Sequence, residues 1–128
     1  MKSWEQRISH NNSTESRAFK YLTQIKGLRF FKNKIRSVKK SDFISDCGQQ
    51  FEIKRISYFG KNQPKIVFTK QQILNFSDDA NILIFEPFAN IPIIETKMKN
   101  IREKDSFFIK VLINENQIKN RKLQIQMR

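Results

Sequence analysis

Three charged residues at close spacing carry the chemistry that this sequence could perform. Asp42 precedes Glu52, and Lys54 follows two residues after Glu52. Between the two acids lies Asp46-Cys47-Gly48, a run typical of a tight turn. If a β-hairpin turns about Cys47, positions at equal distance from it face one another, so Asp42 would lie opposite Glu52 on one face. Lys54 shares that face because strand side chains alternate.

Two carboxylates and an ammonium group held together fit a site for a divalent cation. Like charges side by side are unfavourable unless a positive charge lies between them. Mg²⁺ takes oxygen ligands and keeps several waters. A metal-bound water can attack a phosphodiester, and a nearby ammonium can neutralise the charge that develops on phosphorus. The alternative is an exposed ladder of ion-paired side chains, which is common and contributes little to stability.

Composition and charge point to one small domain with a polyanionic partner. The chain has 128 residues, with 25 Lys and Arg against 12 Asp and Glu, and a formal net charge of +13. At 38% hydrophobic with 12 Phe it can close a core. A single cysteine, Cys47, excludes disulfide frameworks and cysteine-rich zinc sites. The positive excess favours nucleic acid as the partner.

The sequence lacks the features of a membrane or secreted protein. It has no run of about 18 uncharged apolar residues, which a transmembrane helix requires. Residues 1–13 have no apolar centre of the kind a signal peptide carries. We therefore expect an intracellular protein, in the cytoplasm or nucleoid.

Hydrophobic periodicity predicts an α/β fold in which helices flank a mixed β-sheet. A polar arm over 1–12 precedes an amphipathic helix that Asn12 or Ser13 caps and Gly27 ends. The hairpin follows, and Thr69 caps a second helix over 70–76. The other expected segments are a strand from 28 to 32 that extends towards 38, a loop at 57–64, strands at 65–68, 81–86, 91–94 (an edge) and 106–113, and a short helix or basic tail at 114–128.

The hairpin motif resembles a known family. Ser41-Asp42-Phe43, a turn, and Phe51-Glu52-Ile53-Lys54 are similar to the metal-site motif of the PD-(D/E)XK nuclease superfamily, with Ser41 where the family has Pro. The resemblance covers residues 13–86, more than half of the chain. Within it, residues 65–85 resemble a segment of archaeal Holliday-junction resolvases, and the small basic composition also resembles homing-type members.

This resemblance implies a restriction-endonuclease-like fold and an endodeoxyribonuclease that depends on Mg²⁺ or Mn²⁺. The implied metal ligands are carboxylates and one backbone carbonyl, and the other implied roles are water activation and positioning. In this sequence the metal ligands are Asp42, Glu52, the carbonyl of Ile53 and, as an additional ligand, Glu15. Lys54 would activate the attacking water, and Gln72 (or Gln71) would position the site.

Basic and aromatic residues around the hairpin are the candidates for DNA contact: Arg36, Lys39, Lys40, Arg55, Tyr58 and Lys61. In the alternative interpretation, the lysines before the hairpin lie on a solvent-exposed strand edge and prevent that strand from pairing wrongly. Because one small domain reaches one phosphodiester, cutting both strands implies a homodimer or larger homo-oligomer. A non-catalytic nucleic-acid-binding module or a ribonucleoprotein component stays open as the other class of function. The presence of both acids with Lys54 favours chemistry.

Overall fold

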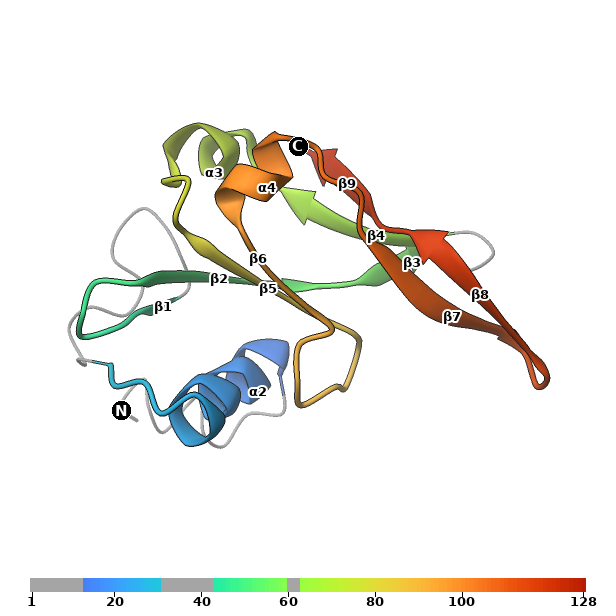
Figure 1. Ribbon diagram of the computed structural model, residues 1–128, viewed down its shortest axis with the longest axis horizontal. Coiled ribbons are helices and arrows are strands. Elements are labelled where there is room, and N and C mark those ends of the chain that lie inside the picture. The colour runs from blue at the N-terminus through green and yellow to red at the C-terminus, as the bar shows by residue number, and fades with distance from the viewer. Residues whose placement is uncertain (1–12, 31–42, 60–62) are drawn as a thin grey trace.

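The computed structural model describes residues 13–30, 43–59 and 63–128 (Figure 1). Within these ranges most of the regular structure is β-strand, arranged in three small sheets with a few short helices. The chain is therefore a mixed α/β protein, as the sequence predicted.

The largest described sheet is mixed and carries the hairpin. Its order is β1-β2-β5-β6, with β2 and β5 parallel and the outer pairs antiparallel. In β1 and β2, Phe43 pairs with Phe51 and Ile44 with Gln50, which is the predicted register. Gly48 in the turn has φ +86, a conformation that favours glycine. The strand bounds are Phe43–Ile44 (β1), Gln50–Arg55 (β2), Asn81–Phe85 (β5) and Ile94–Lys97 (β6).

The first helix covers one face of this sheet (Figure 1). It runs as an α-helix over Thr14–Lys20 (α2) and continues as a π-helical turn over Tyr21–Ile25 (η1). The Ser13 side chain accepts a hydrogen bond from the backbone of Ser16, so Ser13 is the N-cap. Both ends agree with the sequence prediction. The apolar cluster between helix and sheet comprises Ala18, Tyr21, Leu22, Phe43, Phe51, Leu83 and Phe85.

The opposite face of the sheet is covered by the second and third helices and by a second sheet (Figure 1). That sheet has the order β3-β4-β9, with β3 and β4 antiparallel and β4 and β9 parallel. The larger apolar cluster lies here and includes Ile66, Phe68, Ile82, Ile84 and Met98. The bounds are Ser57–Phe59 (β3), Gln63–Phe68 (β4), Lys70–Asn75 (α3), Met98–Arg102 (α4) and Gln124–Met127 (β9).

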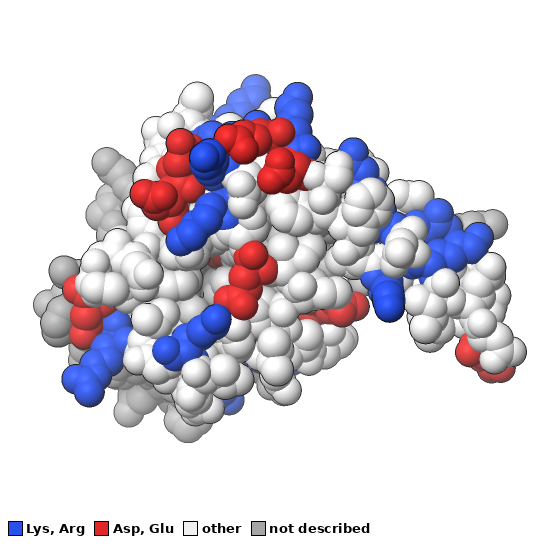
Figure 2. Space-filling view, in the orientation of Figure 1, with Lys and Arg blue, Asp and Glu red and all other residues white. Residues whose placement is uncertain are grey.

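A separate two-stranded hairpin projects from the body (Figure 1). Strand β7 (Phe108–Asn114) pairs antiparallel with β8 (Gln117–Lys122), and β8 contacts β4 at the base. Figure 2 shows Lys and Arg side chains on this projecting part. We call it the β7–β8 hairpin.

Several sequence predictions were wrong. Residues 28–30 form no strand, because Leu28 and Phe30 instead pack beside the α2 cluster. The edge strand begins only at Ile94, since Pro92 has no N–H for the ladder.

The predicted loop at 57–64 contains β3 and the start of β4, in which Tyr58 pairs with Pro64. The segment 114–128, expected as a helix or basic tail, forms β8 and β9 instead. In β9, Ile125 and Met127 alternate with Gln124 and Gln126, which matches the period of a strand. The rest of the predicted 28–38 strand lies outside the described residues.

Candidate functional site

A buried carboxylate lies at the centre of the candidate site. Glu52, on β2, is only 5% exposed. Its Oε2 accepts a hydrogen bond from Gln72 Nε2 at 2.9 Å and lies 3.4 Å from Lys54 Nζ. Lys54 Nζ also donates to Gln72 Oε1 at 2.9 Å. These three side chains form a closed network between β2 and the first turn of α3, which we call the Glu52 network.

The pleat of β2 accounts for two members of this network. Phe51 and Ile53 contact the cluster under α2, so Glu52 and Lys54 project from the other face, towards α3. That face is covered rather than exposed to solvent. The prediction that Glu52 and Lys54 share a face is therefore confirmed, but the alternative in which these two side chains form an exposed ion ladder is wrong.

The cap of α3 fixes the third member. The Thr69 side chain accepts from Gln72 N at 3.1 Å, and Gln72 Oε1 accepts from Thr69 N at 3.0 Å, a capping box. Because the amide oxygen accepts from both Thr69 and Lys54, the amide nitrogen is directed at the Glu52 carboxylate. Gln71, the alternative in the sequence, is exposed. Of the two glutamines, Gln72 is therefore the one that contacts both Glu52 and Lys54.

The environment of Lys54 is largely enclosed as well. Its Nζ lies 4.5 Å from the centroid of the buried Phe68 ring, a cation–π contact. Only 13% of the Lys54 side chain is exposed, against 6% for Glu52. Removing two charges from water is costly unless hydrogen bonds compensate, and here Gln72 bonds to both charges. The ammonium group is therefore held at a fixed point beside the carboxylate.

The structure tests the remaining predicted ligands only in part. Asp42 lies outside the described residues. Glu15 is half-buried in the first turn of α2, a helix that covers the Phe51 side of β2, opposite to the Glu52 network. Ile53 is half-buried against the α2 cluster. The metal-binding roles of these residues stay predictions.

The donor type at the site suits a hard divalent cation. Magnesium binds through one or two carboxylates, completed by waters and substrate phosphate oxygens. Glu52 supplies one carboxylate and Ile53 a neighbouring backbone carbonyl. The described residues contain no group of three His, Cys, Asp or Glu side chains that could hold a metal by themselves. A magnesium site here would therefore need Asp42 or waters in addition.

Two of the predicted DNA-contact residues are described, and both reach the surface. Arg55, at the end of β2, is exposed. Tyr58, on β3, is 38% exposed, and partial burial together with the charge of Glu86 raises the pKa of its hydroxyl above the usual 10.0. Four predicted residues lie outside the described ranges: Arg36, Lys39, Lys40 and Lys61.

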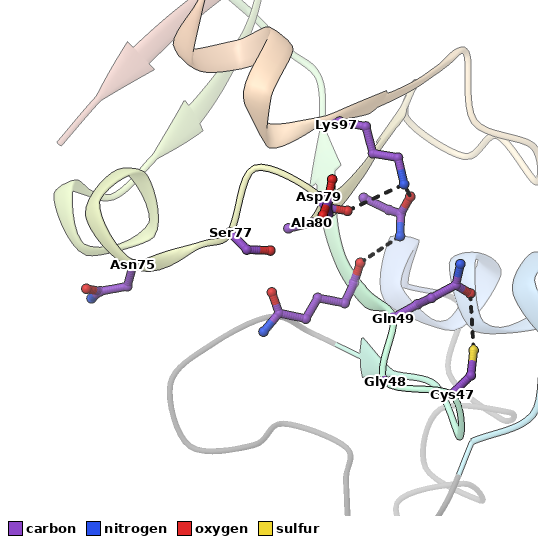
Figure 3. Close-up of a pocket in the computed structure, with 10 residues that line it drawn as sticks. Cys47, Gly48, Gln49, Asn75, Ser77, Asp79, Ala80 and Lys97 are labelled. Atoms are coloured by element: carbon purple, nitrogen blue, oxygen red, sulfur yellow. Dashed lines mark hydrogen bonds between the residues drawn. The ribbon is translucent and has the colours of Figure 1, made fainter.

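A pocket of about 370 Å³, lined mostly by polar residues, lies at the turn between β1 and β2, and the sequence analysis did not identify it. Figure 3 shows the hairpin turn at Cys47–Gln49 on one side and Asn75 and Ser77 on another, with Lys97 reaching in from β6. Lys97 Nζ donates to Asn81 Oδ1 at 2.6 Å. The lining residue Gln50 shares a strand face with Glu52, and this polar alternation along β2 was the available signal.

No family model, curated protein or solved structure matches this chain. In the ranges that the structure describes, no helix has both the length and the apolar character that crossing a bilayer requires.

Proposed function

We propose that this protein is a metal-dependent endodeoxyribonuclease that hydrolyses DNA phosphodiester bonds with a restriction-endonuclease-like fold. The observation that carries the proposal is the Glu52 network, a carboxylate and an ammonium group fixed 3.4 Å apart and bridged by one amide. These are the residues of the PD-(D/E)XK resemblance.

The cost of this arrangement supports a chemical role. Apolar side chains of similar volume would stabilise the interior between β2 and α3 as well as or better than a buried ion pair does. The formal net charge of +13 supplies attraction for a polyanionic substrate.

The roles follow from the positions of the groups. Glu52, together with Asp42 and the carbonyl of Ile53, would hold Mg²⁺ or Mn²⁺. The bound ion would supply an activated water and charge neutralisation at phosphorus. Lys54 would orient the attacking water and stabilise negative charge on the phosphate oxygens in the transition state. Gln72 is a positioning residue, because it holds Lys54 and Glu52 in place through hydrogen bonds to both.

The observed register supports the role of Asp42. The pair Phe43–Phe51 is observed and belongs to the register that the sequence predicted. In that prediction position 42 lies opposite 52. Directly opposed residues of antiparallel strands share a face. We therefore propose Asp42 as the second carboxylate. Glu15 takes no part in this proposed site, because its helix covers the opposite side of β2.

The proposed substrate is DNA, in a branched or a specific duplex form, bound in part by Arg55 and Tyr58. The predicted basic residues outside the described ranges, Arg36, Lys39, Lys40 and Lys61, complete this set. A homodimer would supply two sites for the two strands of a duplex.

Cleavage of a substrate panel tests the proposal. Labelled linear duplex, four-way junction, single-stranded DNA and RNA are incubated with Mg²⁺, Mn²⁺ or EDTA. We expect cutting of a DNA substrate that EDTA abolishes. Lys54→Met keeps the apolar stem of the side chain and should lose cutting, whereas the exposed Lys99→Met should retain it. Tight binding to all substrates with no cutting in either metal would contradict the proposal.

A further inference from the structure

We infer that the β7–β8 hairpin is a DNA-binding ribbon that lies in a groove of duplex DNA. Its residues are not needed by the Glu52 network, and the sequence analysis assigned them no function. The inference requires that the hairpin bind duplex DNA, but it does not require cleavage. Loss of cleavage alone would therefore contradict only the nuclease proposal, and loss of the hairpin's DNA binding would contradict only this inference.

The outer face of the hairpin carries large apolar side chains that the body does not cover. Three cross-strand pairs make up this face. Phe108, Leu112 and Ile118 on it are 61%, 62% and 65% exposed, and Leu112 lies directly opposite Ile118. Exposed apolar side chains that lie together mark an interaction surface. The other two pairs are Phe108 with Lys122 and Lys110 with Asn120.

The charge of the hairpin selects the kind of partner. Residues 108–122 contain four cations, Lys110, Lys119, Arg121 and Lys122, and one acid, Glu115, which lies in the turn. Among the described residues none of these cations forms a salt bridge. A second copy docked on this face would bring lysines towards lysines. A polyanion would neutralise them, so charge complementarity favours nucleic acid.

The dimensions fit the major groove of B-form DNA. Two paired strands are about 4.8 Å apart, and a groove about 12 Å wide admits a two-stranded β-ribbon. The seven residues of β7 extend about 23 Å, enough to follow the groove for several base pairs. Lys110 and Lys122 would contact phosphates, while Asn120, Leu112 and Ile118 would face base edges. Duplex RNA has a deep, narrow major groove that a ribbon cannot enter.

The location of the hairpin agrees with this use. Strand β8 contacts β4, and β4 pairs with β3, which carries Tyr58. The base of the hairpin is therefore linked through β4 to the strand that carries Tyr58, a predicted nucleic-acid contact. A duplex lying along β3 and the β7–β8 hairpin would contact both.

The first test measures duplex binding in the absence of divalent metal at a series of salt concentrations. The triple variant Lys110→Gln, Lys119→Gln, Lys122→Gln should weaken duplex DNA binding at least about tenfold at physiological salt. It should also reduce the slope of log K against log salt by about 2 to 3. The matched control, Lys20→Gln, Lys99→Gln, Lys104→Gln, removes the same charge from exposed positions elsewhere. An equal effect of the two triple variants would overturn the inference.

The second test separates DNA from a second copy of the chain. Leu112→Ser with Ile118→Ser alters two exposed residues, so the fold should persist. For this variant we expect weaker binding to duplex DNA and an unchanged molecular mass in light scattering. For the wild-type protein we expect weaker binding to duplex RNA than to duplex DNA of the same length. Conversion of a dimer to a monomer with unchanged DNA binding would assign the hairpin to self-association and overturn the inference.

Discussion

Replacing Gln72 by Ala tests whether one amide holds the two charges of the network in place. The side chain forms hydrogen bonds with Glu52, Lys54 and the backbone N–H of Thr69, at 2.9, 2.9 and 3.0 Å. A hydrogen bond to a charged group contributes about 1.5 kcal/mol or more, and half of a capping box contributes about 0.5 kcal/mol. Since Gln72 is half-buried, water would replace part of the loss.

We therefore expect the free energy of unfolding to fall by about 2–3 kcal/mol. For a domain of this size, the Tm should fall by about 8–12 °C. Urea and thermal unfolding followed by circular dichroism measure both quantities. Gln71→Ala is the matched control, because it makes the same change at an exposed position of the same helix and should cost less than about 0.5 kcal/mol.

Gln72→Glu distinguishes the contact that residue 72 makes with Glu52 from the contact that it makes with Lys54. It keeps an oxygen acceptor for Lys54 and Thr69 but places a second carboxylate against Glu52, so we expect it to be less stable than wild type at neutral pH. Stabilities of Gln72→Ala and Gln71→Ala that agree within error would refute the reasoning, because the Glu52 network would then be held by other contacts.

Three further predictions concern the frame around the site. Burial, and next the hydrogen bond to Glu95, raise the pKa of Tyr21 above 10.0. The folded state therefore favours the protonated phenol. The stability that Tyr21 contributes is complete below pH 10 and is lost as the pH rises through the raised pKa. Tyr21→Phe should lose about 1 kcal/mol at pH 7, and urea unfolding should show a smaller drop towards pH 11 than wild type. Leu123→Ala, at a position 2% exposed, should lose about 2–4 kcal/mol in urea unfolding, whereas exposed Met127→Ala should lose little. Gly48→Ala at φ +86 should lower the unfolding free energy by about 1 kcal/mol, with a smaller loss for Gly48→Asn.

Local patterns predicted the part of the fold that carries the site. The turn about Cys47 fixed the register of β1 and β2, and the period of 2 fixed the face of Glu52 and Lys54. Thr69 was predicted as the cap of α3, and the structure confirms it and adds Gln72 as the other half of a capping box. Each of these signals spans only a few residues, because neighbouring residues determine turns, caps and strand alternation.

The features that were missed depend on partners distant in sequence. Residues 124–127 form a strand because β4 pairs with them, and a Gln-rich composition hides that pairing. The enclosure of Glu52 requires α3 to cover β2, which a strand pattern alone does not reveal. The polar pocket likewise joins the hairpin turn to Ser77 and Lys97 through tertiary contacts.

Single-turnover cleavage by Glu52→Gln in Mg²⁺ tests the central claim most directly. The substitution keeps the shape of the side chain and removes its charge, while Glu103→Gln removes a charge from an exposed position. The proposed function predicts a rate at least about 100-fold below wild type for Glu52→Gln, with duplex affinity retained and Glu103→Gln unchanged. Equal rates for the two variants would contradict the assignment of the Glu52 network as a catalytic site.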